Sequence, residues 1–66
     1  MDVTVEVVGE GTREVTAEEG ATYADLVRAV GYTTHEVTVL VDGRPVPEDA
    51  AVAVDSVQVL RLVKGG

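Results

Sequence analysis

Apolar and polar residues alternate along the first part of the chain. Between positions 2 and 7 every second residue is a valine, which is the period of a β-strand with one buried face. Residues 9–12 are rich in glycine and predict a hairpin loop. A second strand is expected at 13–17, with Val15 and Ala17 on its inner face.

The spacing of apolar residues changes to that of a helix after Gly20. They recur at i, i+3, i+4 and i+7, which predicts a helix with one buried face. Thr22 is the expected N-cap, and Asp25 lies where its charge favours the positive end of the helix dipole. Gly31 lies where a glycine commonly ends a helix. The four apolar positions are Tyr23, Leu26, Val27 and Val30.

The second half of the chain predicts three more strands. Asp42-Gly43 is a strong turn signal between two of them, and Pro45 and Pro47 restrict the fourth strand to a short edge strand. The order strand, strand, helix, strand, short strand, strand predicts an α+β domain in two layers. The expected segments are a polar connector at 33–36, a strand at 37–41, a loop at 48–55 and a long central strand at 56–63.

Composition limits what this chain does. Its 66 residues fit one domain, and twelve acidic residues against four arginines and one lysine argue against direct nucleic-acid binding. So many carboxylates with so little lysine suggest a salt-adapted cytosol, where charges repel less. We expect a cytoplasmic protein without a membrane segment, because no signal peptide or long apolar run is present.

The candidate chemistry lies at the end, in Lys64-Gly65-Gly66. We expect a domain at 1–63 and a flexible diglycine tail at 64–66, because glycine accepts the extended geometry of a narrow active-site tunnel. The chain has no cysteine, and His35 has no nucleophile to pair with, so neither a thiolate metal site nor a catalytic site is expected. The pair Glu18-Glu19 is interpreted as a solvated turn.

The whole chain resembles the ubiquitin-like β-grasp fold. Residues 39–46 are similar to the third strand, turn and fourth strand of ubiquitin, and residues 60–66 resemble its C-terminal segment. The brevity and acidity, together with residues 22–27 and 35–43, are similar to the small archaeal modifier proteins of haloarchaeal type. The resemblance implies a mixed sheet of four to five strands packed on one helix.

The resemblance also implies a reaction at Gly66. A terminal carboxylate has a pKa near 3.5 and is a poor electrophile. In the family, an E1-like enzyme adenylates it with ATP and Mg²⁺, and the protein itself holds no bound cofactor. The acyl group then passes to a lysine of a target protein, or sulfur is installed as a thiocarboxylate for a tRNA-thiolating enzyme. This chain would be a reactant, not an enzyme.

Two alternatives stay open within this fold. One is a dedicated sulfur carrier for molybdopterin or thiamine synthesis, although molybdopterin subunits usually carry a Pro-Pro run before the tail. The other is a non-covalent ubiquitin-like binding module.

Alternation also predicts a surface for the E1-like partner. Val39, Val57 and Val59 are expected in the core, so Leu40, Leu60 and Leu62 should face away from the helix. Lys64 is interpreted as a positive contact for the activating enzyme. Because Lys64 is the single lysine and lies beside the reacting terminus, we expect chains of the modifier with itself to be scarce. The protein is also expected to be a monomer.

Overall fold

Five strands and one helix follow the predicted order in the computed structural model, which describes residues 1–62. They connect as a hairpin, a helical crossover and three further strands. The elements are β1 (Asp2–Val7), β2 (Gly11–Thr16), α1 (Tyr23–Ala29), β3 (Val37–Val41), β4 (Arg44–Pro45) and β5 (Ser56–Arg61).

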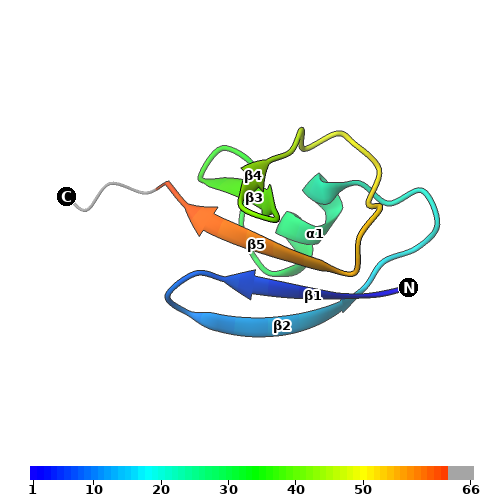
Figure 1. Ribbon diagram of the computed structural model, residues 1–66, viewed down its shortest axis with the longest axis horizontal. Helices are drawn as coiled ribbons and strands as arrows, with labels where there is room; N and C mark the ends of the chain where they lie inside the picture. The colour runs from blue at the N-terminus through cyan, green and yellow to red at the C-terminus, as the bar shows by residue number, and fades with distance from the viewer. Residues whose placement is uncertain (63–66) are drawn as a thin grey trace.

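The strands form one mixed sheet in the order β2-β1-β5-β3-β4 (Figure 1). The central pair β1 and β5 is parallel, whereas β1–β2, β3–β5 and β3–β4 are antiparallel. The last strand therefore lies beside the first, in the middle of the sheet. This arrangement confirms the predicted α+β fold with a central last strand.

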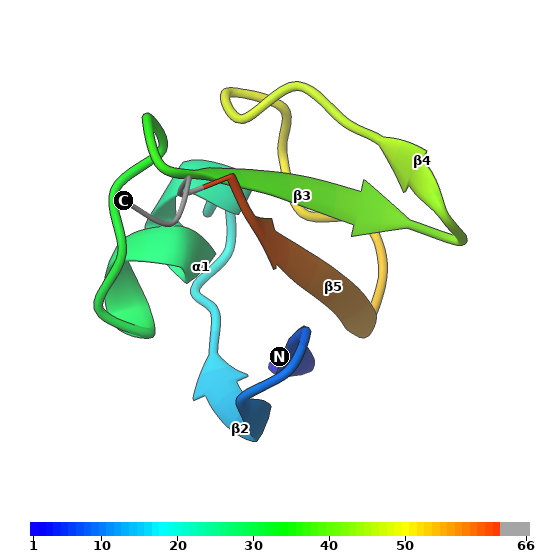
Figure 2. The same ribbon diagram turned by 90° about the vertical axis from the view of Figure 1, so that its left-hand side faces the viewer.

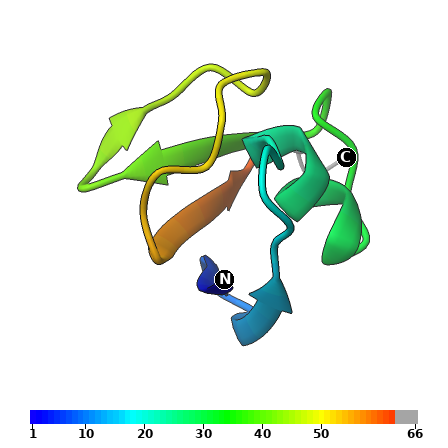
Figure 3. The same ribbon diagram turned by 90° about the vertical axis from the view of Figure 1, so that its right-hand side faces the viewer.

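The core lies between the sheet and α1, which crosses one face of it (Figures 2 and 3). Alternation along β1, β3 and β5 sends a row of valines towards the helix, and all of these valines except Val41 are buried. No buried side-chain nitrogen or oxygen among the described residues lacks a hydrogen-bond partner. The buried residues are Val3, Val5, Val7, Ala17, Tyr23, Leu26, Val27, Val30, Val37, Val39, Val57 and Val59.

Helix α1 begins and ends at the predicted signals. The backbone N–H of Asp25 donates to the hydroxyl of Thr22 at 3.4 Å, and the N–H of Thr22 donates to the Asp25 carboxylate at 2.9 Å. This reciprocal capping box satisfies two N–H groups that the helix cannot satisfy itself. At the other end Gly31 has φ = 94°, and its N–H donates to the carbonyl of Arg28 at 3.0 Å.

The turn between β3 and β4 has the geometry that its sequence predicts. Asp42 has φ = 53° and Gly43 has φ = 79°. Positive φ at both central residues matches a type I′ turn, in which aspartate and glycine are favoured because their steric cost is low. The turn fixes the register in which Leu40 faces Pro45 and Val41 faces Arg44.

Three predicted boundaries were wrong by one or two residues. Strand β2 covers Gly11–Thr16 instead of 13–17, because the ladder with β1 extends to the pair Val7 and Gly11. The hairpin loop is correspondingly shorter. Strand β5 ends at Arg61, where its pairing with Val37 ends, although its apolar sequence continues. The predicted domain boundary at 63–64 lies outside the described residues.

Replacing Thr22 with alanine should reduce the free energy of unfolding by about 1 kcal/mol, because the capping hydroxyl is lost while the core is unchanged. Urea unfolding followed by circular dichroism measures the difference. Thr12→Ala is the matched control, since Thr12 is an exposed residue of β2 and caps no helix. Equal stability of the two variants would contradict the capping role.

Candidate functional site

Strand β5 directs the chain towards the predicted reactive residues. Its first four residues pair with β1, and its pairing with β3 continues to Arg61, so β3 holds the end of the strand. Lys64, Gly65 and Gly66 lie outside the described residues, so their predicted roles stay predictions. The described residues that precede them are Leu60, Arg61 and Leu62.

Leu60 lies on the face of the sheet opposite the helix. Its neighbour Val59 is fully buried under α1, so alternation turns Leu60 outwards, where 40% of it is exposed. Leu40 is on the same face, because its strand neighbour Val39 is buried in the core. Leu40 pairs with Gln58, which makes Leu40 and Leu60 diagonal neighbours across β3 and β5.

Val8 joins these two leucines, and the sequence analysis missed it. The pair Val7 and Val59 ends the parallel ladder, so Val8 and Leu60 follow side by side. The N–H of Val8 also donates to the carbonyl of Val59 at 3.0 Å, and 40% of Val8 is exposed. Val8 continues the series of even-numbered positions that are polar in the first strand, so the sequence could have revealed it as an apolar residue on the outer face. We call Val8, Leu40 and Leu60 the outer patch.

Leu62 occupies a different place. It follows the end of β5, so strand alternation no longer sets its direction. Its N–H donates to the carbonyl of Glu36 at 2.7 Å, and half of the residue is exposed. It lines a groove of about 290 Å³ beside the edge of β3, together with the core residues Val27 and Val39. The structure thus brings Leu40 and Leu60 together and places Leu62 beside another surface.

A polar cluster lies at the base of the C-terminal segment. Glu10, from the β1–β2 loop, pairs with the guanidinium of Arg61 at the end of β5. The hydroxyl of Tyr32, which follows the helix, donates to the Glu10 carboxylate at 2.6 Å. The guanidinium of Arg61 lies over the Tyr32 ring, 5.5 Å from its centre. We call Glu10, Tyr32 and Arg61 the base cluster.

The three groups perturb one another's proton affinity. The hydrogen bond from Tyr32, followed by that from Arg61, lowers the pKa of Glu10. The hydrogen bond to Glu10 raises the pKa of Tyr32, and the same carboxylate raises the pKa of Arg61. The pKa of Glu10 is lowered because these hydrogen bonds stabilise its charged carboxylate form. The cluster connects the hairpin loop, the segment after the helix and the last residues of β5.

His35 is exposed in its connector, as expected. Within residues 1–62, no three histidine, cysteine or acidic side chains are grouped to hold a metal ion. The helix that the structure describes is too short to cross a membrane.

The profile of the family described as small archaeal modifier protein 2 matches residues 1–63. The chain belongs to this family. It is 71% identical to small archaeal modifier protein 2 of Haloferax volcanii over 66 residues, which cover 100% of both proteins. It is also 31% identical to an uncharacterized protein of Archaeoglobus fulgidus over 67 residues, again covering 100% of both.

The crystal structure of the Haloferax volcanii protein has the same fold. It matches with a TM-score of 0.77 at 70% identity, covering 97% of each chain. The predicted ubiquitin-like β-grasp fold is therefore confirmed, as is the resemblance to small archaeal modifier proteins. Proteins of this family are modifiers rather than enzymes, which agrees with the prediction that this chain is not a catalyst.

Replacing Glu10 with glutamine should lower the melting temperature at neutral pH, because Arg61 loses its charged partner. Since the folded pKa of Glu10 is lowered, its contribution is present above the unfolded pKa and is lost as the pH falls through the folded value. The difference from wild type should therefore begin to shrink near the unfolded glutamate pKa of about 4.3 and keep shrinking as the pH falls through the lower folded pKa.

Thermal unfolding from pH 7 to pH 3 measures this difference. Glu19→Gln is the matched control, because it removes the same charge from an exposed turn position. A stability loss at pH 7 that persists unchanged at pH 3, or that equals the loss in the control, would contradict the role of the ionised carboxylate.

Proposed function

We propose that this protein is attached through the Gly66 carboxylate to lysines of target proteins, and that the same terminus carries sulfur for tRNA 2-thiolation. Membership of the small archaeal modifier protein 2 family, combined with the ending Lys64-Gly65-Gly66, is the observation that supports this proposal. The proposed partners are an E1-like adenylating enzyme, target-protein lysines and a tRNA-thiolating enzyme. The reaction belongs to the cytoplasm, where ATP is supplied.

The chemistry follows from the state of a terminal carboxylate. Its pKa near 3.5 makes it an anion in the cell, and an amine does not displace oxygen from such a group. The E1-like enzyme would join it to the AMP part of ATP, with Mg²⁺ balancing the phosphate charge and pyrophosphate leaving. Attack by a lysine amine then forms the isopeptide bond and releases AMP. Attack on the same carbonyl carbon by a sulfide-level sulfur donor would instead displace AMP and leave the thiocarboxylate.

The fold supports this proposal by holding the base of the tail. Strand β5 is paired on both sides, and Arg61 contacts Glu10 and Tyr32 from two other segments. A rigid domain would let the activating enzyme hold the protein while the last residues extend into its active site. The glycines would give access because they have no Cβ. Lys64 is proposed as a positive contact for the same enzyme.

The outer patch is the proposed docking surface for the activating enzyme. Val8, Leu40 and Leu60 are apolar side chains on the face that the helix does not cover, and Leu60 lies next to the base of the tail. Apolar residues grouped on one sheet face are typical of an interaction surface. Around them, the amide of Gln58 donates to the Glu6 carboxylate at 3.2 Å, which gives the patch a polar margin.

Deleting Gly65 and Gly66 should abolish both conjugation and thiocarboxylate formation, while the melting temperature stays unchanged. Purified protein is incubated with its E1-like enzyme, ATP and a sulfur source, and intact mass reports the replacement of oxygen by sulfur. A blot of cell extracts from strains that express tagged wild type or tagged deletion reports conjugates. ATP-dependent conjugates of the deleted protein would overturn the proposal.

The same two measurements separate the alternatives. A dedicated sulfur carrier would form the thiocarboxylate without any conjugates, whereas a non-covalent module would show neither product. Conjugates together with a loss of tRNA 2-thiolation in the deletion strain are the expected result.

Leu60→Ala and Leu40→Ala should each raise the KM of the activating enzyme about fivefold, since truncating an apolar side chain within an interface costs about 1 kcal/mol. Stability should change little, because both residues lie outside the buried core. Pyrophosphate release measures activation. Thr16→Ala is the control, because Thr16 lies on the same sheet face but at the far end of β2, where it pairs with Asp2. An unchanged KM in both leucine variants would refute this surface.

A further inference from the structure

The two edges of the sheet are protected to different degrees. The β4 edge is only two residues long, contains Pro45 and is followed by Pro47. Proline removes backbone donors and blocks the addition of a further strand. The β2 edge has six residues without proline or lysine, and no strand of residues 1–62 pairs with its outer side.

The register shows which backbone groups of β2 face outwards. The amino group of Met1 donates to the carbonyl of Ala17 at 3.0 Å, and the N–H of Ala17 donates to the carbonyl of Met1 at 2.7 Å. In an antiparallel ladder such doubly bonded pairs recur at every second residue. Odd-numbered residues of β2 therefore bond to β1. The N–H and C=O groups of Thr12, Glu14 and Thr16 point away from the sheet.

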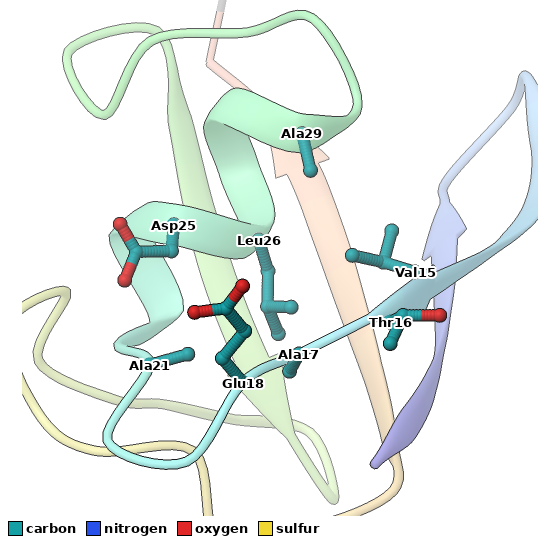
Figure 4. Close-up of a pocket in the computed structure, with 8 residues that line it drawn as sticks. All are labelled: Val15, Thr16, Ala17, Glu18, Ala21, Asp25, Leu26 and Ala29. Carbon is teal, nitrogen blue, oxygen red and sulfur yellow. The ribbon is translucent and has the colours of Figure 1, made fainter.

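A groove runs beside this edge, between β2 and α1 (Figure 4). Its volume is about 340 Å³, which is room for a large aliphatic side chain. The groove exists because the side chains that face each other across it are small, so they do not fill the space between the helix and the strand. Its apolar lining is Val15, Ala17, Ala21, Leu26 and Ala29.

One end of the groove is acidic. Figure 4 shows the carboxylates of Glu18 and Asp25 near one another beside Ala21, whereas Val15 and Ala29 lie at the other end. The Asp25 carboxylate already accepts a hydrogen bond from the Arg28 guanidinium at 2.8 Å. Glu18 is the second acidic residue that lines this end of the groove. The whole chain also carries a net charge of −7. The groove therefore favours a positively charged occupant over an acidic one.

A second copy of this chain fits the edge poorly. Two β2 strands that pair about a twofold axis through Glu14 would place the two Glu14 side chains directly opposite each other. Like charges in that position are destabilising. The net charge of −7 on each copy adds to the repulsion.

We propose that the β2 edge and its groove bind an extended peptide, which adds to the sheet as a sixth strand and carries an aliphatic residue next to a lysine or arginine. Backbone bonds to Glu14 and Thr16 would supply affinity, and the groove would select the aliphatic side chain. In an antiparallel orientation the basic residue precedes the aliphatic one, because Glu18 follows the end of β2. This non-covalent interaction is independent of the proposed reaction at Gly66.

Nuclear magnetic resonance titration of the ¹⁵N-labelled, untagged chain tests the proposal. The probe is an end-blocked peptide, Lys-Lys-Val-Thr-Val-Thr, and the matched probe carries glutamate in place of both lysines. The basic peptide should give saturable shifts of the amides of Thr12, Glu14 and Thr16 and of the groove residues. The acidic peptide should bind at least threefold more weakly.

Two variants sharpen the test. Glu14→Pro removes an outward N–H that β1 does not use, and it should weaken binding about fivefold, the effect of one hydrogen bond. Glu18→Lys should weaken binding about threefold, whereas Asp49→Lys, which makes the same change in net charge at an exposed loop position, should have a smaller effect. Both charge variants leave the buried core intact.

Three results would overturn the proposal. They are shifts centred on the outer patch, equal binding of the basic and acidic peptides, and β2 shifts that depend on protein concentration without peptide, which would indicate self-association. Deleting Gly65 and Gly66 should leave peptide affinity unchanged. Failure of the conjugation assay and failure of this titration are therefore distinguishable.

Discussion

The parallel pairing of β1 with β5 is the interaction on which the rest of the structure depends. It joins the first and last strands of the described fold in the register Val5 with Val57 and Val7 with Val59, and these four residues are at most 4% exposed. Parallel neighbours require a crossover, and here the crossover includes α1, which covers the valines. Without this pairing the hairpin and the second half of the sheet would be separate pieces.

The same pairing also brings together the side chains of the base cluster and of the outer patch. It places the end of β5 beside the loop that carries Glu10, so Arg61 reaches a carboxylate 51 positions earlier in the sequence. It also places Val8 next to Leu60. The base cluster and the outer patch therefore lie at the same end of the sheet, on its two faces, and both are consequences of one strand register.

Local signals predicted the elements well because each has a nearby physical cause. The cap at Thr22, the positive φ at Gly31 and the turn at Asp42-Gly43 involve residues within a few positions of each other. The buried rows of β1 and β5 follow from alternation alone. A core of valine and leucine without disulfides needs this agreement between local and global preferences, since a domain of 66 residues has little stability to lose.

The surface features were less predictable because they depend on how strands lie side by side. Tyr32 and Glu10 are 22 positions apart, and only the sheet order brings them together. Val8 belongs to the outer patch only because β1 and β5 are parallel in that register. The end of β5 at Arg61 depends on where its partner β3 begins, which the apolar run of its own sequence does not show. The β2 groove likewise depends on the distance between a strand and a helix.

The two tyrosines give this molecule separate optical reporters. The chain contains no tryptophan or phenylalanine, so its near-ultraviolet signal comes from Tyr23 and Tyr32 alone. Tyr23 is 4% exposed in the core, and its hydroxyl accepts from the N–H of Ala53 at 3.3 Å. Tyr32 instead donates to Glu10 under the guanidinium of Arg61. A partial loss of the near-ultraviolet signal while the far-ultraviolet signal of the folded chain stays constant would show the base of the tail opening while the core stays folded.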